Sequence, residues 1–190
     1  EYVGKEGIRP PFHPDFTFGT FGVSAPTSPV YSPKDKPAVE VKSTVSGSLH
    51  TNNAAVMYIL LNIDPETQET GNKENRRNIT YLEAKGAGEG PNSPGLGKDY
   101  VYRDPWGSPY IITLDLNYDG RARDSFYRSD VHRDGSAHPL VGLVDPDKTM
   151  KSDLEIRDPV AVWSFGPDQQ AIPTKPATQE ENKDNILSWQ

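Results

Sequence analysis

The apolar residues of the chain predict a few short elements separated by long polar loops. The clearest helical pattern covers residues 52–63, where apolar residues recur at steps of three and four positions. These residues are Ala55, Val56, Ile59, Leu60 and Ile63. Thr51 or Asn52 is suited to cap the first free amide groups, and the ring of Pro65 disfavours helical geometry at Asp64. We therefore expect one short helix that ends before Pro65.

After residue 100 the pattern changes to strands. Residues 109–115 carry β-branched and aromatic side chains, and residues 121–127 follow the turn signal Asp119-Gly120. An Asp-Gly dipeptide readily supplies the positive φ angles of a tight turn, so we predict that the two segments pair as an antiparallel hairpin. Residues 160–165 are nearly all apolar, which predicts a third, central strand. Weaker patterns predict a strand at 39–45, a short element at 79–84 and a short helix at 148–154.

The first 48 residues are rich in proline, glycine, serine and threonine. Their aromatic residues lie at spacings that fit neither a clean strand nor a helix. These are Phe12, Phe16, Phe18 and Phe21. Because basic neighbours are lacking, the rings form a poor platform for nucleic-acid bases. We interpret residues 1–48 as an extended segment that lays its aromatic rings on the core.

Length and composition indicate a single domain with a modest core. The 190 residues are only 34% hydrophobic, and 18 prolines and 16 glycines exclude long helices. We expect one domain over residues 1–190, with the core in 49–190. Trp106 follows a proline turn into an apolar strand, and Trp163 lies in the most apolar segment, so we predict that both are buried.

Charge and cysteine content narrow the classes of partner. The formal net charge is -7 and no lysine or arginine cluster is evident, which argues against nucleic acid as a partner. The absence of cysteine excludes disulfides and thiolate metal sites. No apolar run reaches the length of about eighteen residues that a membrane span needs, and the start lacks the plan of a signal peptide.

Motifs for catalysis are missing, and we predict that the protein is not an enzyme. The four histidines lie in loop-like contexts without a partner at helical metal-ligand spacing. They are His13, His50, His132 and His138. His132 and His138, on either side of Asp134, could in principle bind zinc, but we favour a pair of solvated loop histidines. The glycine-rich stretch 86–90 has an acidic residue where a phosphate would sit, and no nucleophile elbow is present.

The segment from Asp115 to Gly120 repeats the opening of a calcium loop. Asp115, Asn117 and Asp119 supply oxygens at positions one, three and five before the glycine of the sharp bend. The twelfth position is Phe126, where a bidentate glutamate would be required. A plain hairpin turn explains the same residues, and we favour the turn over a metal site.

Three separated segments carry a resemblance to a known family. They are Asp104-Pro105-Trp106-Gly107-Ser108-Pro109-Tyr110, Val162-Trp163-Ser164-Phe165-Gly166-Pro167-Asp168 and Asp184-Asn185-Ile186-Leu187-Ser188-Trp189. In this order they resemble the signature segments of the major pseudopilins, the pilin-like subunits of bacterial type II secretion systems. The resemblance covers residues 50–64 and 79–189.

The resemblance implies an α+β fold and a structural function. The expected fold is a pilin-like globular head with an antiparallel β-sheet, one short helix and long loops; the family's long N-terminal helix, which anchors the subunit in the inner membrane, is not in this sequence. The expected function is self-assembly, with other pilin-like subunits and the secretion machinery, into an extracytoplasmic filament or a related pilus-like fibre. The expected location is the periplasmic or extracellular face of a bacterial inner membrane.

The resemblance also implies a calcium site in the C-terminal loop. The ligands carried over from the family are the side chains of Asp168, Asp184 and Asn185 and the main-chain carbonyls of Phe165 and Pro167. This chain departs from the family between them, because the connection 169–183 is longer and contains two prolines. A solvated acidic tail is the alternative interpretation.

Two other functions remain open. A calcium-stabilised, β-rich module that binds carbohydrate or another surface would stack sugar rings on exposed aromatic side chains, for which Trp106, Tyr118 and Trp189 are the candidates. A hydrolase of unknown type is the third interpretation.

Overall fold

The computed structural model describes residues 15–19, 53–90, 93–133, 139–146 and 154–190. Within these ranges the fold is α+β, with one α-helix and antiparallel strands. The strand predicted at 39–45, most of the helix predicted at 148–154, and three of the four histidines lie outside the described residues. The segment 79–84 contains no regular element.

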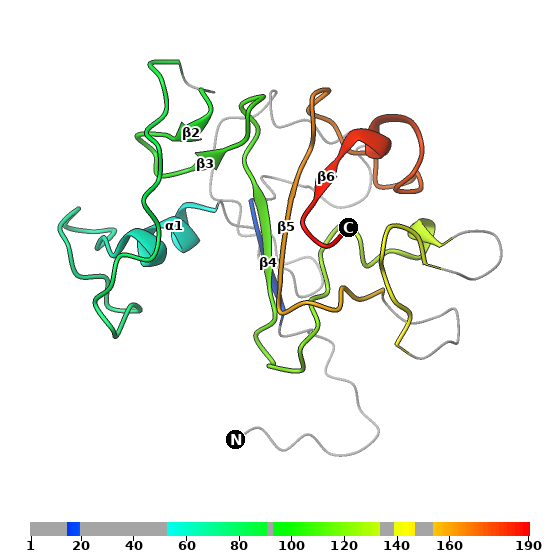
Figure 1. Ribbon diagram of the computed structural model, residues 1–190, viewed down its shortest axis with the longest axis horizontal. Coiled ribbons are helices and arrows are strands. Elements are labelled where there is room, and N and C mark those ends of the chain that lie inside the picture. The colour runs from blue at the N-terminus through cyan, green and yellow to red at the C-terminus, as the bar shows by residue number, and fades with distance from the viewer. Residues whose placement is uncertain (1–14, 20–52, 91–92, 134–138, 147–153) are drawn as a thin grey trace.

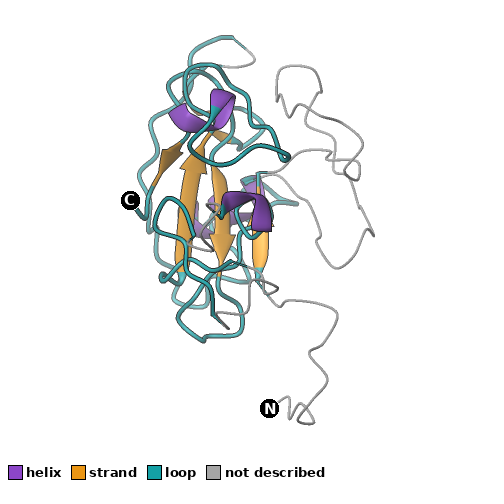
Figure 2. Ribbon diagram, turned by 90° about the vertical axis from the view of Figure 1, so that its right-hand side faces the viewer, coloured by secondary structure: helices purple, strands orange, loops and turns teal. Residues whose placement is uncertain are grey.

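A four-stranded sheet forms the centre of the fold, in the order β1-β4-β5-β6 (Figure 1). Its strands are β1 (Phe16–Phe18), β4 (Ile111–Leu114), β5 (Val160–Ser164) and β6 (Ile186–Leu187). A second, two-stranded sheet joins β2 (Gly95–Leu96) to β3 (Tyr102–Arg103). Figure 2 shows the strands of the central sheet side by side, with loops around them. The prediction that residues 160–165 form a central strand is confirmed, because β5 pairs with β4 on one edge and with β6 on the other.

The predicted hairpin between 109–115 and 121–127 is wrong. One edge of β4 pairs with β1 and the other with β5, so neither edge is left for residues 121–127. Within that segment only Ala122 makes an isolated bridge, and its partner is Ile156. The Asp-Gly signal marks a real turn, since Gly120 has φ 78°. After the turn, however, the chain runs into the interior of the protein and does not pair with β4.

The helix α1 (Ala54–Leu61) is shorter than predicted. It ends at Asn62, which adopts left-handed geometry with φ 59° and donates its backbone N–H to the carbonyl of Ile59. The stop therefore comes before the Asp64-Pro65 pair. At the other end, the side chain of the buried Asn53 does not cap the helix. It bonds the backbone of Tyr102 and the carbonyl of Tyr110, which ties α1 to β3 and to the start of β4.

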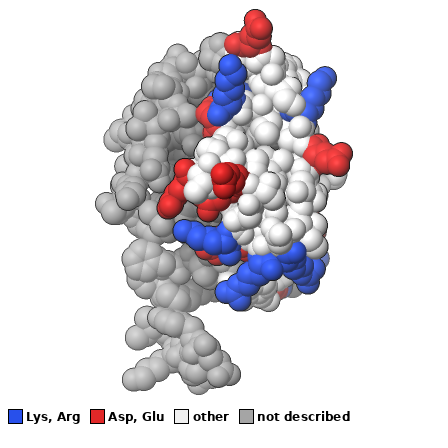
Figure 3. Space-filling view, turned by 90° about the vertical axis from the view of Figure 1, so that its left-hand side faces the viewer, with Lys and Arg blue, Asp and Glu red and all other residues white. Residues whose placement is uncertain are grey.

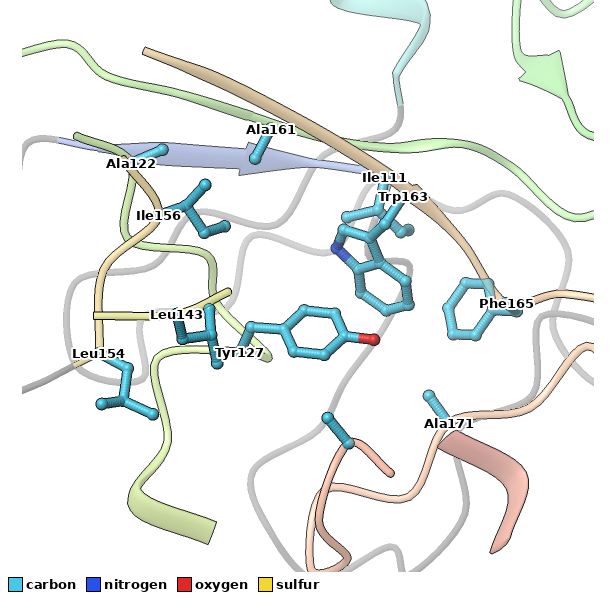
Figure 4. Close-up of a cluster of buried hydrophobic side chains, with 11 residues drawn as sticks. Ile111, Ala122, Tyr127, Leu143, Leu154, Ile156, Ala161, Trp163, Phe165 and Ala171 are labelled. Atoms are coloured by element: carbon cyan, nitrogen blue, oxygen red, sulfur yellow. The ribbon is translucent and has the colours of Figure 1, made fainter. Parts of the chain in front are cut away.

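One face of the central sheet carries the hydrophobic core. Ile111 and Trp163 are directly paired across β4 and β5 and point to this side, where Tyr127 packs edge-on to the Trp163 ring at 5.1 Å (Figure 4). In Figure 1 the core-forming segments after β4 lie to one side of the sheet, and α1 with β2 and β3 lies to the other. The burial predicted for Trp163 is confirmed.

The burial predicted for Trp106 is wrong, because its side chain is 38% exposed. Trp106 lies at the tip of a tight turn in which Gly107 donates its N–H to the Asp104 carbonyl. The central residues of such a turn point outward. The proline that was expected to lead the tryptophan into the core instead places it at the corner.

The opposite face of the central sheet is also apolar. Strand alternation and the observed register place on it Phe16, Phe18, Ile112, Leu114, Val160, Val162 and Ile186. Val160 and Ile186 are about half exposed, at 48% and 55%. The sheet therefore has two apolar faces, of which one carries the core described above.

Candidate metal centre

The C-terminal loop begins where the central strand β5 ends. Gly166 has φ 69°, and its backbone lies so close to the Asp184 carbonyl that a Cβ at this position would collide with it. Only glycine fits such an approach. The two ends of the loop, at residues 166 and 184, are therefore held in contact by the backbone itself.

The structure brings together the two aspartates predicted as metal ligands. The backbone N–H of Asp168 donates to Oδ2 of Asp184 over a long 3.4 Å, and Oδ1 of Asp168 accepts from Gln170 at 2.9 Å. Burial raises the pKa of Asp168 above its usual value, and the negative charges of Asp184 and Glu181 raise it further. Two carboxylates thus repel each other at a place where a cation would relieve the repulsion.

Three buried oxygens in this region have no hydrogen-bond partner. They are Oδ1 of Asp184, Oδ1 of Asn185 and Oε2 of Glu181. Asn185 is only 8% exposed, and its Nδ2 donates to the Tyr127 hydroxyl at 2.8 Å, which leaves its Oδ1 directed away from that hydroxyl. Buried polar atoms in native proteins almost always have a partner, so this group of orphaned oxygens calls for a ligand or water.

The middle of the loop is ordered by one side chain that sequence reasoning missed. Asn182 is 2% exposed; its Oδ1 accepts the N–H of Ile172 and its Nδ2 donates to the carbonyls of Ile172, Lys175 and Pro176. Asn182 lies in the 3-10 helix η3 (Glu180–Asp184), which carries Asp184 at its end. The longer connection thus folds into a support for the acidic residues.

The predicted backbone ligands lie at the start of the same loop. The ring of Phe165 is 1% exposed and packs on Trp163 at 5.0 Å, which fixes the backbone that leads into the loop. Figure 4 shows the Tyr127 hydroxyl pointing to the side on which Phe165 and Ala171 lie. The packed ring of Phe165 therefore fixes the start of the loop to the core. Pro167, two residues later, is exposed.

The donor set fits calcium in its chemistry. Carboxylate, amide and carbonyl oxygens on a loop are the ligands that this ion accepts. Within the described ranges, no three His, Cys, Asp or Glu side chains form a group that could hold a metal by themselves. A site here must therefore draw on Asn185 and on backbone carbonyls in addition to the two aspartates.

The secondary candidate forms a turn whose oxygens are already used. The carboxylate of Asp115 accepts the N–H groups of Tyr118 and Gly120, and Asn117 donates to Asp119. Asp15 lies nearby: burial raises its pKa above the usual value, and the charges of Asp115 and Asp119 raise it further. The turn interpretation explains these residues without a metal.

The one described histidine is not solvated as expected. His132 is fully buried, with its ring 5.1 Å from the rings of Phe126 and Tyr127 and Nε2 3.2 Å from the Phe126 carbonyl. Burial lowers its pKa to about 4, so the ring is neutral at pH 7. Its surroundings are those of a core residue, and no acidic residue is paired with it among the bonds described.

The three aromatic candidates for sugar stacking do not form a common platform. Trp106 precedes β4 and Tyr118 follows it, so they lie at opposite ends of this strand. Trp189 packs on Tyr127 at 5.3 Å and donates its indole N–H to the Val141 carbonyl. On the face that Figure 3 shows, acidic and basic side chains lie in several small groups on an otherwise uncharged surface.

Comparisons of this chain with family models, curated proteins and solved structures give no match. Across the described residues, no helix has the length and apolar character that crossing a membrane requires.

Proposed function

We propose that the protein is a structural subunit of an extracytoplasmic, pilus-like filament in type II protein secretion, with a pilin-like head stabilised by calcium at its C-terminal loop. One observation carries the proposal. The three segments that resemble the major pseudopilins are far apart in the sequence, and side-chain and backbone contacts join all three.

The junction runs from the first segment to the last. Ser164 donates from its hydroxyl to Oδ2 of Asp104 and accepts the N–H of Gly166. Gly166 in turn lies against the Asp184 carbonyl. This contact between the three segments is what the proposal requires, because the signature segments of a family are expected to form one connected part of its fold.

The second apolar face of the central sheet supports the same function. A filament subunit of this kind packs its sheet on a long apolar helix, and such packing requires a sheet that is apolar on the face opposite its own core. The alternating residues of β1, β4 and β5 provide this face, from Phe16 and Phe18 to Val160 and Val162.

In this proposal calcium joins the end of β5 to the C-terminal tail. Asp168, Asp184 and Asn185, with the carbonyls of Phe165 and Pro167, would hold the ion, which neutralises the repulsion between the two carboxylates. Three other residues support these ligands. Gly166 permits the close approach of the two ends of the loop, Asn182 orders the loop, and Tyr127 orients the amide of Asn185.

The upstream reading frame tests the filament function. A short basic leader, a Gly-Phe cleavage junction and a glutamate five residues into an apolar helix are expected ahead of Glu1. Expression of that frame with a prepilin peptidase should yield a processed subunit whose new N-terminus is visible by mass spectrometry. A frame without these features, or a product that the peptidase leaves uncut, would contradict the proposal.

A further inference from the structure

Glu181 is an acidic residue that the family resemblance does not assign to the calcium site. It lies in η3, inside the connection that is longer here than in the family. Its Oε2 is buried and has no hydrogen-bond partner. A cation bound beside this oxygen would supply the partner that it lacks.

The geometry of η3 places Glu181 and Asp184 on the same side. In a 3-10 helix the side chains at positions i and i+3 eclipse each other, and these two residues are three apart in Glu180–Asp184. Both carry a buried, unpartnered oxygen. The intervening Asn182 points the other way, into the loop, where its amide binds Ile172.

A further observation points to a ligand between these groups. Asn185 is 8% exposed, and its Oδ1 has no hydrogen-bond partner although its Nδ2 is fixed on Tyr127. The negative charge of Glu181 also reaches Asp168, at the other end of the loop. Glu181, Asp184 and Asn185 thus each carry a buried oxygen without a hydrogen-bond partner in the last part of the loop.

We propose that Glu181 is a third carboxylate ligand of the calcium ion, supplied by the segment that lengthens this loop. The inference rests on the calcium site proposed above. The three carboxylates are not yet gathered into a compact group. The ion must therefore draw Glu181 inward by rotation of its side chain, while Asp168 and Asp184 stay in place on the closed ends of the loop.

The test compares Glu181→Gln with Glu180→Gln by calorimetric titration of the 190-residue chain with calcium. Glu180 is exposed and paired with Lys175 at 2.7 Å, so its substitution removes the same charge from the same helix without touching the site. We expect Glu181→Gln to weaken calcium binding by about tenfold or more, because ligand charge sets the affinity of such sites. Glu180→Gln should weaken it by less than about twofold, as for an exposed charge.

A spectroscopic measurement separates a ligand from a structural residue. Terbium replaces calcium in oxygen sites, and its luminescence lifetimes in H2O and D2O count the water molecules bound to the ion. Glu181→Gln should add at least one water, and Glu180→Gln should add none. In chelator, Glu181→Gln should melt no lower than the unmodified chain, because it removes a negative charge that acts unfavourably on Asp168.

The possible outcomes separate a failure of the role proposed for Glu181 from a failure of the calcium site itself. Binding by the unmodified chain, its loss in Asp184→Asn, and equal affinity and hydration in Glu181→Gln and Glu180→Gln would overturn the role of Glu181 and leave the calcium site intact. An unmodified chain that binds neither calcium nor terbium would overturn both.

Discussion

The indole N–H of Trp163 donates to Oδ2 of Asp124 at 3.1 Å, inside the core. The same oxygen accepts the Thr113 hydroxyl at 2.5 Å, and Oδ1 accepts the N–H groups of Phe126 and Tyr127. A carboxylate that is 1% exposed is thus satisfied by four donors. It connects β4, β5 and the segment that was expected to form a hairpin.

Removal of this carboxylate should be severe. Asp124→Ala leaves buried donors without a partner, each at a cost of about 1 to 3 kcal/mol, so the free energy of unfolding should fall by about 3 kcal/mol or more. Urea unfolding measures the change. Asp119→Ala, in the exposed turn, is the control and should change stability by less than about 1 kcal/mol. Equal losses in the two variants would contradict the role of Asp124.

The two tryptophans should respond differently to truncation. Trp163→Ala removes a fully buried ring and should lower the free energy of unfolding by about 3 to 5 kcal/mol. Trp106→Ala removes a side chain at an exposed corner and should cost about 1 kcal/mol. Thermal melting of both variants checks the order, which the opposite ranking would refute.

Sequence patterns correctly predicted the elements that are determined by neighbouring residues in the chain. The apolar run of β5 is such a case, since a short continuous apolar segment is typical of a strand in the middle of a sheet. The Asp119-Gly120 pair also marked a true turn. Its consequence was mispredicted because the partner of a strand is decided by distant segments, here β1 and β5, and not by the turn itself.

The residues of the candidate metal centre could likewise be predicted only in part. Asp168 and Asp184 were identified through the family resemblance, and the structure holds them together through Gly166, whose close approach leaves no room for a side chain. Asn182 was missed because nothing in a single sequence distinguishes a buried asparagine of a polar loop from a solvated one. Only the folded loop reveals which of its polar residues are buried.

The buried histidine makes stability depend on pH. The folded-state pKa of His132 is about 4, below the unfolded value near 6.5, so between these values the unfolded chain binds a proton that the folded chain does not. Stability is therefore lost as pH falls from 6.5 toward 4. Between pH 7.5 and pH 4.5 the contribution of His132 should be about 2 to 3 kcal/mol.

Unfolding by urea at the two pH values, with His132→Gln as the comparison, isolates this contribution. The variant removes the titrating group, so its loss of stability on acidification should be smaller than that of the unmodified chain by the stated amount. An identical pH dependence in both proteins would show that His132 does not control it. Carboxylates that titrate in this range act on both proteins alike and cancel in the difference.

The last prediction concerns calcium and the closure of the loop. Binding to the folded state alone raises its stability by about 2.7 kcal/mol when free calcium is a hundred times the dissociation constant. The chain should therefore melt at a higher temperature in calcium than in chelator. Asp168→Ala and Asp184→Ala should abolish this difference, because each removes a ligand from one end of the loop. Asp119→Ala should keep it, since the carboxylate of Asp119 is engaged within its own turn. A calcium response that persists in the first two variants and disappears in the third would place the ion at the turn after β4. The unpartnered oxygens of the C-terminal loop would then be bound by water.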